Sequence, residues 1–157
     1  MALEADRSLV RLMVARGPVF GYEVAAGYVV YRGSITALLS DGTVIPAGVA
    51  APAGLTVVAN IGLASQQQNN IANQNVVSPN YGPGPVEIDR GTWALPFDEA
   101  PSWANYGASV YAIDDQTVSL SDGSSPASGN TPAVAATRLK IGVLVGFDER
   151  GMPFVTI

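Results

Sequence analysis

Short apolar runs rich in Val, Ile, Leu and Thr alternate along the chain with clusters of Gly, Pro, Ser, Asn and Asp. Runs of this length, bounded by turn-forming residues, predict β-strands. In residues 86–90 the apolar positions alternate with acidic ones, which is the pattern of a half-exposed strand. The expected strands cover residues 27–31, 34–39, 44–45, 55–63, 86–90, 92–95, 108–113, 117–120, 139–147 and 152–157.

Several connections between these runs have the composition of tight turns. Asp41-Gly42 lies between two apolar runs and is a strong signal for a hairpin. Residues 114–116 fit a three-residue hairpin connection, and Gly151 can adopt the positive φ that the last turn needs. Gly62, inside an otherwise apolar run, indicates a bulge or the close approach of another segment.

Other segments lack the strand pattern. Residues 5–16 fit one face of a helix or one face of a strand, so residues 1–26 are interpreted as an N-terminal arm without a fixed conformation. Residues 66–85 carry no charge, are rich in Gln and Asn and end with three prolines, which predicts a long loop; residues 121–133 predict another polar loop. Residues 27–157 are then expected to form one all-β domain, a small β-barrel or sandwich of about eight to ten strands.

The composition bears on partners. Only 13% of residues are charged and 48% are hydrophobic, so the surface has few charges and is expected to contact other proteins. The net charge of −5, without a cluster of Lys or Arg, argues against binding of nucleic acid. No apolar run approaches the roughly 20 residues of a membrane span, and the first residues lack the basic-then-apolar order of a secretory signal. We therefore expect no nucleic-acid or membrane partner, and synthesis in the cytoplasm.

The chain contains no histidine and no cysteine, which excludes Ser-His-Asp and Cys-His catalysis, disulfide bonds and metal sites built from imidazole or thiolate. Two acidic pairs are adjacent in sequence; their side chains would point to opposite faces of an extended segment, which favours solvated turns over a catalytic pair. These pairs are Asp98 with Glu99 and Asp114 with Asp115. Residues 122–124 match only part of a calcium loop, and Lys140 is expected on the polar face of a strand. We expect no enzyme, no cofactor and no metal.

Aromatic and arginine side chains are the candidates for binding. The aromatic residues fit either a sugar-binding platform or a subunit interface, and the second is favoured because Trp93 lies in an alternating strand and aromatic residues are enriched at interfaces. Arg7 and Arg11 are spaced to share a helical face and to pair with acidic residues of a partner, or they are simply solvated. The candidate contact residues are Arg7, Arg11, Tyr81, Trp103 and Tyr106.

Three short motifs follow one another in the second half of the chain: Gly91 with Leu95-Pro96, then Gly107 with Val110-Tyr111, then Ile141-Gly142 with Val155 and Ile157. Their order resembles the small head-decoration proteins of tailed bacteriophages, a family often described only as a domain of unknown function. Gly62-Leu63-Ala64 is similar to an earlier strand of that family, so the resemblance covers about residues 27–157. Residues 1–26 have no counterpart, and residues 66–85 are longer than the usual connection.

The resemblance implies a small β-barrel or β-tulip that forms a homotrimer on the outer surface of an expanded phage head. Such a protein would contact the major capsid protein, stabilise the capsid lattice and be located in the virion. The N-terminal arm and residues 66–85 are expected to gain order at these contacts, since neither has the composition to form a core alone.

Three other functions stay open. The first is a carbohydrate-binding β-sandwich, which requires an exposed aromatic platform. The second is an enzyme that uses only carboxylates, which requires a buried acid with a raised pKa. The third is another virion component, such as a tail or head-completion protein, which would form rings of six or twelve copies rather than trimers.

Overall fold

The computed structural model describes residues 20–72, 85–129 and 131–157. In this part of the chain, twelve strands form two five-stranded sheets and a two-stranded pair, and there is one short 3-10 helix. This arrangement confirms the all-β class. The sheets are not closed into a barrel, so the sandwich-like alternative is the one observed. There are more strands than the roughly eight to ten expected, because two of them, residues 21–23 and 68–69, are too short to leave a periodic pattern in a sequence.

The first sheet has the strand order β1-β7-β5-β3-β4. In β7, Val86 and Ile88 are buried and their neighbours in the strand are not, as the alternation predicts. The predicted hairpin joins β3 to β4: Gly42 has a φ of 87°, and Asp41 Oδ1 accepts hydrogen bonds from the backbone N–H (3.0 Å) and hydroxyl (2.8 Å) of Thr43. The strands are β1 (Gly21–Glu23), β3 (Ile35–Leu39), β4 (Val44–Pro46), β5 (Val57–Ala64) and β7 (Pro85–Asp89).

Gly62 on β5 marks the close approach expected from the sequence. Its φ is 146°, and a β-carbon there would lie 2.6 Å from the Asp89 carbonyl oxygen and 2.6 Å from Ile88 Cγ2. The register between β5 and β3 shifts beside this residue, between Thr36 and Ala37. A side chain at position 62 would therefore push β7 away from β5.

A two-stranded pair, β2 (Val29–Val30) and β6 (Gln68–Asn69), packs on the first sheet. Strand β6 lies within residues 66–85, where the sequence predicts a loop, and β1 lies within residues 1–26, interpreted as an arm. Both strands pair with segments far along the chain, and local composition does not reveal such pairing. The rest of the two segments, residues 1–19 and 73–84, lies outside the described residues.

The second sheet has the order β10-β9-β11-β12-β8. The chain ends on the predicted hairpin between β11 and β12, in which Gly151 has a φ of 80° and Asp148 Oδ1 accepts hydrogen bonds from the backbone N–H groups of Arg150 (2.9 Å) and Met152 (2.8 Å). The strands are β8 (Thr92–Ala94), β9 (Ser109–Ala112), β10 (Val118–Ser119), β11 (Lys140–Phe147) and β12 (Pro153–Thr156).

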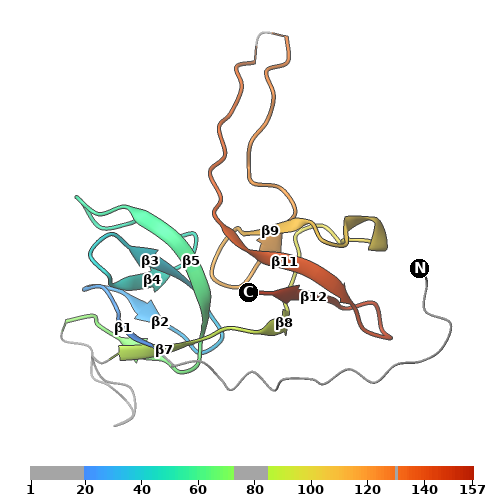
Figure 1. Cartoon of the computed structure of the whole chain (residues 1–157). Coiled ribbons are helices and arrows are strands. Elements are labelled where there is room, and N and C mark those ends of the chain that lie inside the picture. Colours follow the sequence, from blue (N-terminus) through green and yellow to red (C-terminus); the bar gives the residue numbers. More distant parts are fainter. Residues whose placement is uncertain (1–19, 73–84, 130) are drawn as a thin grey trace, which may run out of the picture.

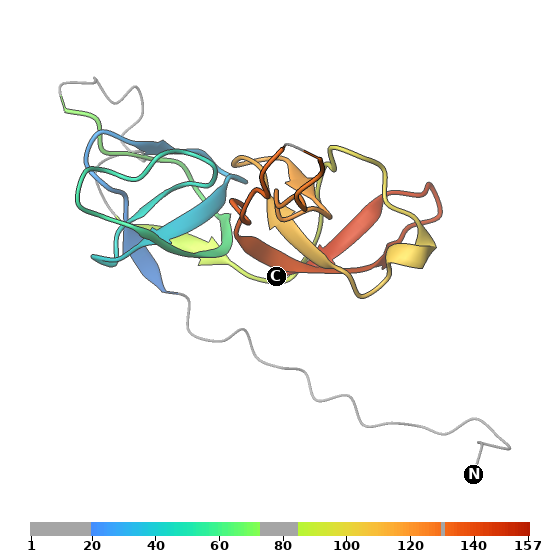
Figure 2. The ribbon, with the colours of Figure 1, turned by 90° about the horizontal axis from the view of Figure 1, so that it is seen from above.

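One hydrophobic core joins the two sheets, which lie side by side in Figures 1 and 2. Its members at 1% exposure or less include large apolar side chains from both: Ile35, Leu39 and Ile45 of the first sheet, and Val110, Val118, Leu144 and Val155 of the second. A second, smaller core fills the space between the first sheet and the β2–β6 pair. Since the larger core needs both sheets, neither sheet buries its apolar face alone.

Hydrogen bonds reinforce this joint. Ser34 Oγ donates to Asp115 Oδ2 (2.8 Å), and the backbone N–H of Ile35 donates to the Asp115 carbonyl oxygen (2.6 Å). Asn60 Nδ2, from β5, donates to the carbonyl oxygen of Leu139 (2.9 Å), just before β11. The two sheets are therefore fixed relative to each other by specific polar contacts as well as by packing.

Candidate interaction surface

The aromatic residues predicted to make contacts lie on and just after the 3-10 helix η1 (Trp103–Asn105), at the end of the second sheet away from the first (Figures 1 and 2). The helix, which the sequence analysis did not predict, begins after Ser102. Asn105 Oδ1 accepts hydrogen bonds from the backbone N–H (2.9 Å) and hydroxyl (3.1 Å) of Ser102. Gly107, with a φ of 81°, donates its N–H to the carbonyl oxygen of Leu144 (2.9 Å), which ties the segment to β11.

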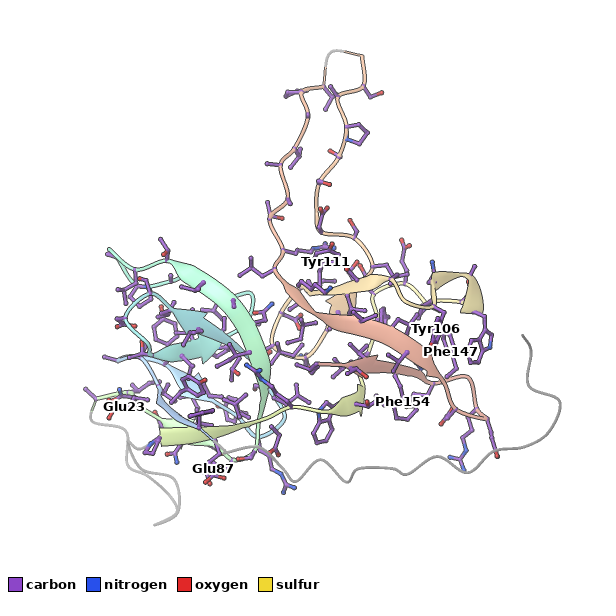
Figure 3. The ribbon with its side chains drawn as sticks, viewed as in Figure 1. Glu23, Glu87, Tyr106, Tyr111, Phe147 and Phe154 are labelled. Atoms are coloured by element: carbon purple, nitrogen blue, oxygen red, sulfur yellow. The ribbon has the colours of Figure 1, made fainter. Side chains whose placement is uncertain are left out.

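Trp103 and Tyr106 are 66% and 63% exposed, which is unusual for side chains of their size. The Trp103 ring packs against Phe147 with ring centroids 4.8 Å apart and an interplanar angle of 60°. Figure 3 shows Tyr106 and Phe147 at the same end of the second sheet. We call Trp103, Tyr106 and Phe147 the aromatic patch; Trp103 packs against the partly buried Phe147, and Trp103 and Tyr106 are exposed.

The other candidate contact residues either lie outside the described residues or are less exposed. Arg7, Arg11 and Tyr81 lie outside the described residues, so their role stays a prediction. Trp93 is 36% exposed on the edge strand β8, where it pairs with Val155. Among the predicted contact residues, Trp103 and Tyr106 are therefore the two that the structure brings together.

A second exposed feature is the projecting hairpin, made of the described residues 121–129 and 131–139. It leaves the second sheet after β10, stands away from both sheets and returns at β11 (Figure 1); seen from above it is viewed nearly end-on (Figure 2). Two pairs of backbone hydrogen bonds join its strands, between Ser125 and Val134 (2.9 and 3.1 Å) and between Ser128 and Thr131 (3.0 and 3.1 Å). Residues 121–133 were predicted only as a polar loop. No local signal separates them from other loops, because an uncharged stretch such as residues 123–137 also occurs at residues 66–85.

The base of the projecting hairpin is anchored. The backbone N–H groups of Thr137 and Arg138 both donate to the Asp122 carbonyl oxygen (3.0 Å each). Arg138 Nη1 donates to the Ser121 carbonyl oxygen (3.1 Å) and lies 4.0 Å from Asp98 Oδ2. Beyond this base, the described residues between 124 and 137 are all exposed, and none is charged.

Carboxylates of both acidic pairs accept hydrogen bonds that stabilise turns. Asp114 Oδ1 accepts hydrogen bonds from the backbone N–H groups of Gln116 (2.9 Å) and Thr117 (2.6 Å). The Asp115 side chain instead accepts a hydrogen bond from the Ser34 hydroxyl. Asp98 Oδ1 accepts a hydrogen bond from the backbone of Glu99 (2.9 Å). Each described contact thus stabilises the local backbone or the joint between the sheets.

Replacing Asp114 with asparagine tests the role of this carboxylate. Partial burial raises the pKa of Asp114, but hydrogen bonds from Gln116 and Thr117 outweigh it and hold the pKa below its ordinary value of 3.8. Stabilisation of this kind is present above the unfolded pKa and is lost as the pH falls through the folded pKa. We expect Asp114→Asn to be less stable than wild type in urea at about pH 7 and the difference to shrink at about pH 2.5. A difference that does not change with pH would contradict this role.

Hydrogen bonds from the hydroxyl and backbone of Ser124 lower the pKa of Asp122, and Lys140 begins β11 as an exposed residue. In the described part of the chain, no three His, Cys, Asp or Glu side chains are grouped as a metal ion would require. Nor does any helix in residues 20–72, 85–129 or 131–157 have the length and apolar character needed to cross a membrane.

The motif residues that resemble phage decoration proteins occupy structural positions in the second sheet. The Gly91 carbonyl oxygen accepts a hydrogen bond from the backbone of Ile157 (2.8 Å), which holds the end of the chain beside β8. A β-carbon at Gly142 would overlap the carbonyl oxygen of Thr156 and lie 2.8 Å from Val155 Cγ1, so only glycine fits between β9 and β12. Val110 is completely buried.

Comparisons with known proteins give no relative. No family model matches the chain, and no match was found among curated proteins or among solved structures.

Proposed function

We propose that this chain is a non-enzymatic virion protein that binds the outer surface of an expanded phage head as a trimer and stabilises the capsid lattice. The observation that supports the proposal most directly is that the motif residues have specific structural roles in one sheet. Gly91, Gly107 and Gly142 each allow a contact that a side chain or a different φ would prevent. These positions support the proposal because the motif residues are required by this fold.

The exposed surface is consistent with this role. Large aromatic side chains contribute strongly to binding when a partner covers them. Trp103 and Tyr106 are open on a scaffold that already fixes the ring of Trp103 against Phe147, so little side-chain freedom is lost on binding. We infer that the aromatic patch contacts the major capsid protein.

The proposed mechanism is assembly energetics. A trimer seated where capsid subunits meet adds buried surface that exists only in the closed shell, so rupture of the shell must also break those contacts. Because three linked copies bind together, modest contacts by each copy combine into strong attachment. No proton transfer or covalent step is needed for this function.

Removing residues 1–16 tests the contribution of the N-terminal arm. The deletion ends before β1, which starts at Gly21, and removes Arg7 and Arg11, two of the predicted contact residues. We expect head attachment, measured by sedimentation with heads that lack the protein, to weaken about tenfold or more. The circular dichroism spectrum and the oligomer mass should stay those of the full chain. Loss of folding would contradict the assignment of these residues to attachment.

A carbohydrate-binding sandwich is the second candidate, and the same open aromatic patch favours it, since sugar rings stack on flat aromatic faces. Tryptophan fluorescence over a panel of glycans separates the two functions. A glycan-induced change that is lost in Trp103→Ala, together with no binding to heads, would replace our proposal. A tail or head-completion protein would instead bind as rings of six or twelve copies.

A further inference from the structure

The projecting hairpin has features that the attachment of a single chain to a capsid does not explain. Its base is fixed by Asp122 and Arg138, yet the described residues from 124 to 137 have no core of their own and are exposed. An isolated two-stranded ribbon is only marginally stable in water. Because its base is anchored, such a segment projects from the sheets. We expect a partner to cover it in the functional state.

The backbone of the hairpin offers an edge for pairing. Val134 and Ser125 exchange two hydrogen bonds, so in an antiparallel ribbon the neighbouring Ala133 and Ala135 direct their N–H groups outward. No hydrogen bond within the described residues satisfies these two groups. The side chains here are small, which allows close approach, and Val134 adds an apolar surface that is 47% exposed.

Charge indicates which partner covers the hairpin. The described residues contain eleven acidic and five basic side chains, a net charge of −6, so two copies of the body repel each other. Residues 123–137 carry no charge and stand away from the sheets. Contact through an uncharged segment that projects from the body lets copies meet without bringing the negatively charged sheets together. This charge distribution favours a second copy of the chain as the partner.

We propose that the projecting hairpins of separate copies of this chain pack against one another and form the main contact that holds the oligomer together. The inference rests on the proposed function, because it identifies the surface that makes the decoration trimer. The aromatic patch, at the far end of the second sheet, then stays free to bind the capsid. Self-association and attachment are assigned to different surfaces.

A pair of matched substitutions tests the proposal in the full-length chain. Val134 and Val58 are both exposed, at 47% and 58%, but Val134 lies on the projecting hairpin and Val58 on β5. We expect Val134→Asp to raise the concentration at which half of the oligomer dissociates by about tenfold or more in analytical ultracentrifugation, because like charges then face each other. Val58→Asp should leave that concentration unchanged. Equal effects of the two variants, or no effect of Val134→Asp, would overturn the proposal.

The absence of cysteine allows an independent test of proximity. Val134→Cys and Val58→Cys each introduce the single thiol of the chain. A short bis-maleimide should link copies through position 134 and not through position 58. Cross-linking at 58 alone, or a wild-type protein that stays monomeric at the concentrations where it saturates heads, would exclude the hairpin contact. In the second case attachment to heads would still stand as a proposal, without a trimer formed beforehand. A hairpin-linked oligomer that does not bind heads would support this inference and contradict the proposed function.

Discussion

Replacing Leu144 with alanine should lower the free energy of unfolding by about 3 kcal/mol, because it opens a cavity in the core that both sheets share. Leu144 is completely buried on β11, and the core around it includes Ile35 and Leu39 of the first sheet. The loss should be measured by urea denaturation. Tryptophan fluorescence, which reports on the second sheet, and far-ultraviolet circular dichroism, which reports on both, should show one coincident transition.

Leu139 provides the matched control. It is 38% exposed and contributes its carbonyl oxygen, not its side chain, to the bond with Asn60. Leu139→Ala should change the free energy of unfolding by no more than about 0.5 kcal/mol. Similar losses for both substitutions, or two separate transitions in the wild type, would contradict a shared core.

Replacing Gly142 with alanine should cost about 3 kcal/mol for a different reason. A methyl group there would overlap the carbonyl oxygen of Thr156 and press on Val155, so β11 and β12 must move apart. The backbone of Gly142 does not have a positive φ, so the loss would arise from overlap alone. The free energy of unfolding in urea, compared with wild type, measures it.

Gly54→Ala is the control for backbone strain without overlap. Gly54 has a φ of 83°, and no atom lies within 4 Å of the position of its β-carbon. We expect a loss of about 1 kcal/mol, the cost of the left-handed conformation for alanine. If Gly142→Ala lowered the free energy of unfolding no more than Gly54→Ala does, the predicted overlap at position 142, between β9 and β12, would be contradicted.

Local patterns predicted much of this fold. Asp41-Gly42 and Gly151 mark two hairpins, and the alternation around Val86 gives β7 its buried face, because turn geometry and side-chain period are properties of neighbouring residues. Strand β2 falls within the strand expected at residues 27–31, but its partner β6 was beyond this reasoning. Strand β6 has two residues and depends on a partner about forty positions away, so no period forms.

The interaction surface was predictable only in part. Residue type pointed to Trp103 and Tyr106, but their grouping with Phe147 depends on η1 and on the bond between Gly107 and β11. The projection of the hairpin from the body could not be predicted from its residues. Its composition is that of an ordinary polar loop, and whether such a segment lies on the body or stands away from it is decided by the anchors at its base, Asp122 and Arg138. Those contacts cannot be read from local sequence.

Attachment to a phage head can be measured by mixing the purified full-length protein with expanded heads that lack it and counting the copies bound per head after sedimentation. We expect saturation at three copies, or a multiple of three, per lattice site, and bound heads that withstand more heat than bare ones. Absence of binding at any concentration, or binding in rings of six or twelve copies without a gain in heat resistance, would contradict the proposed function.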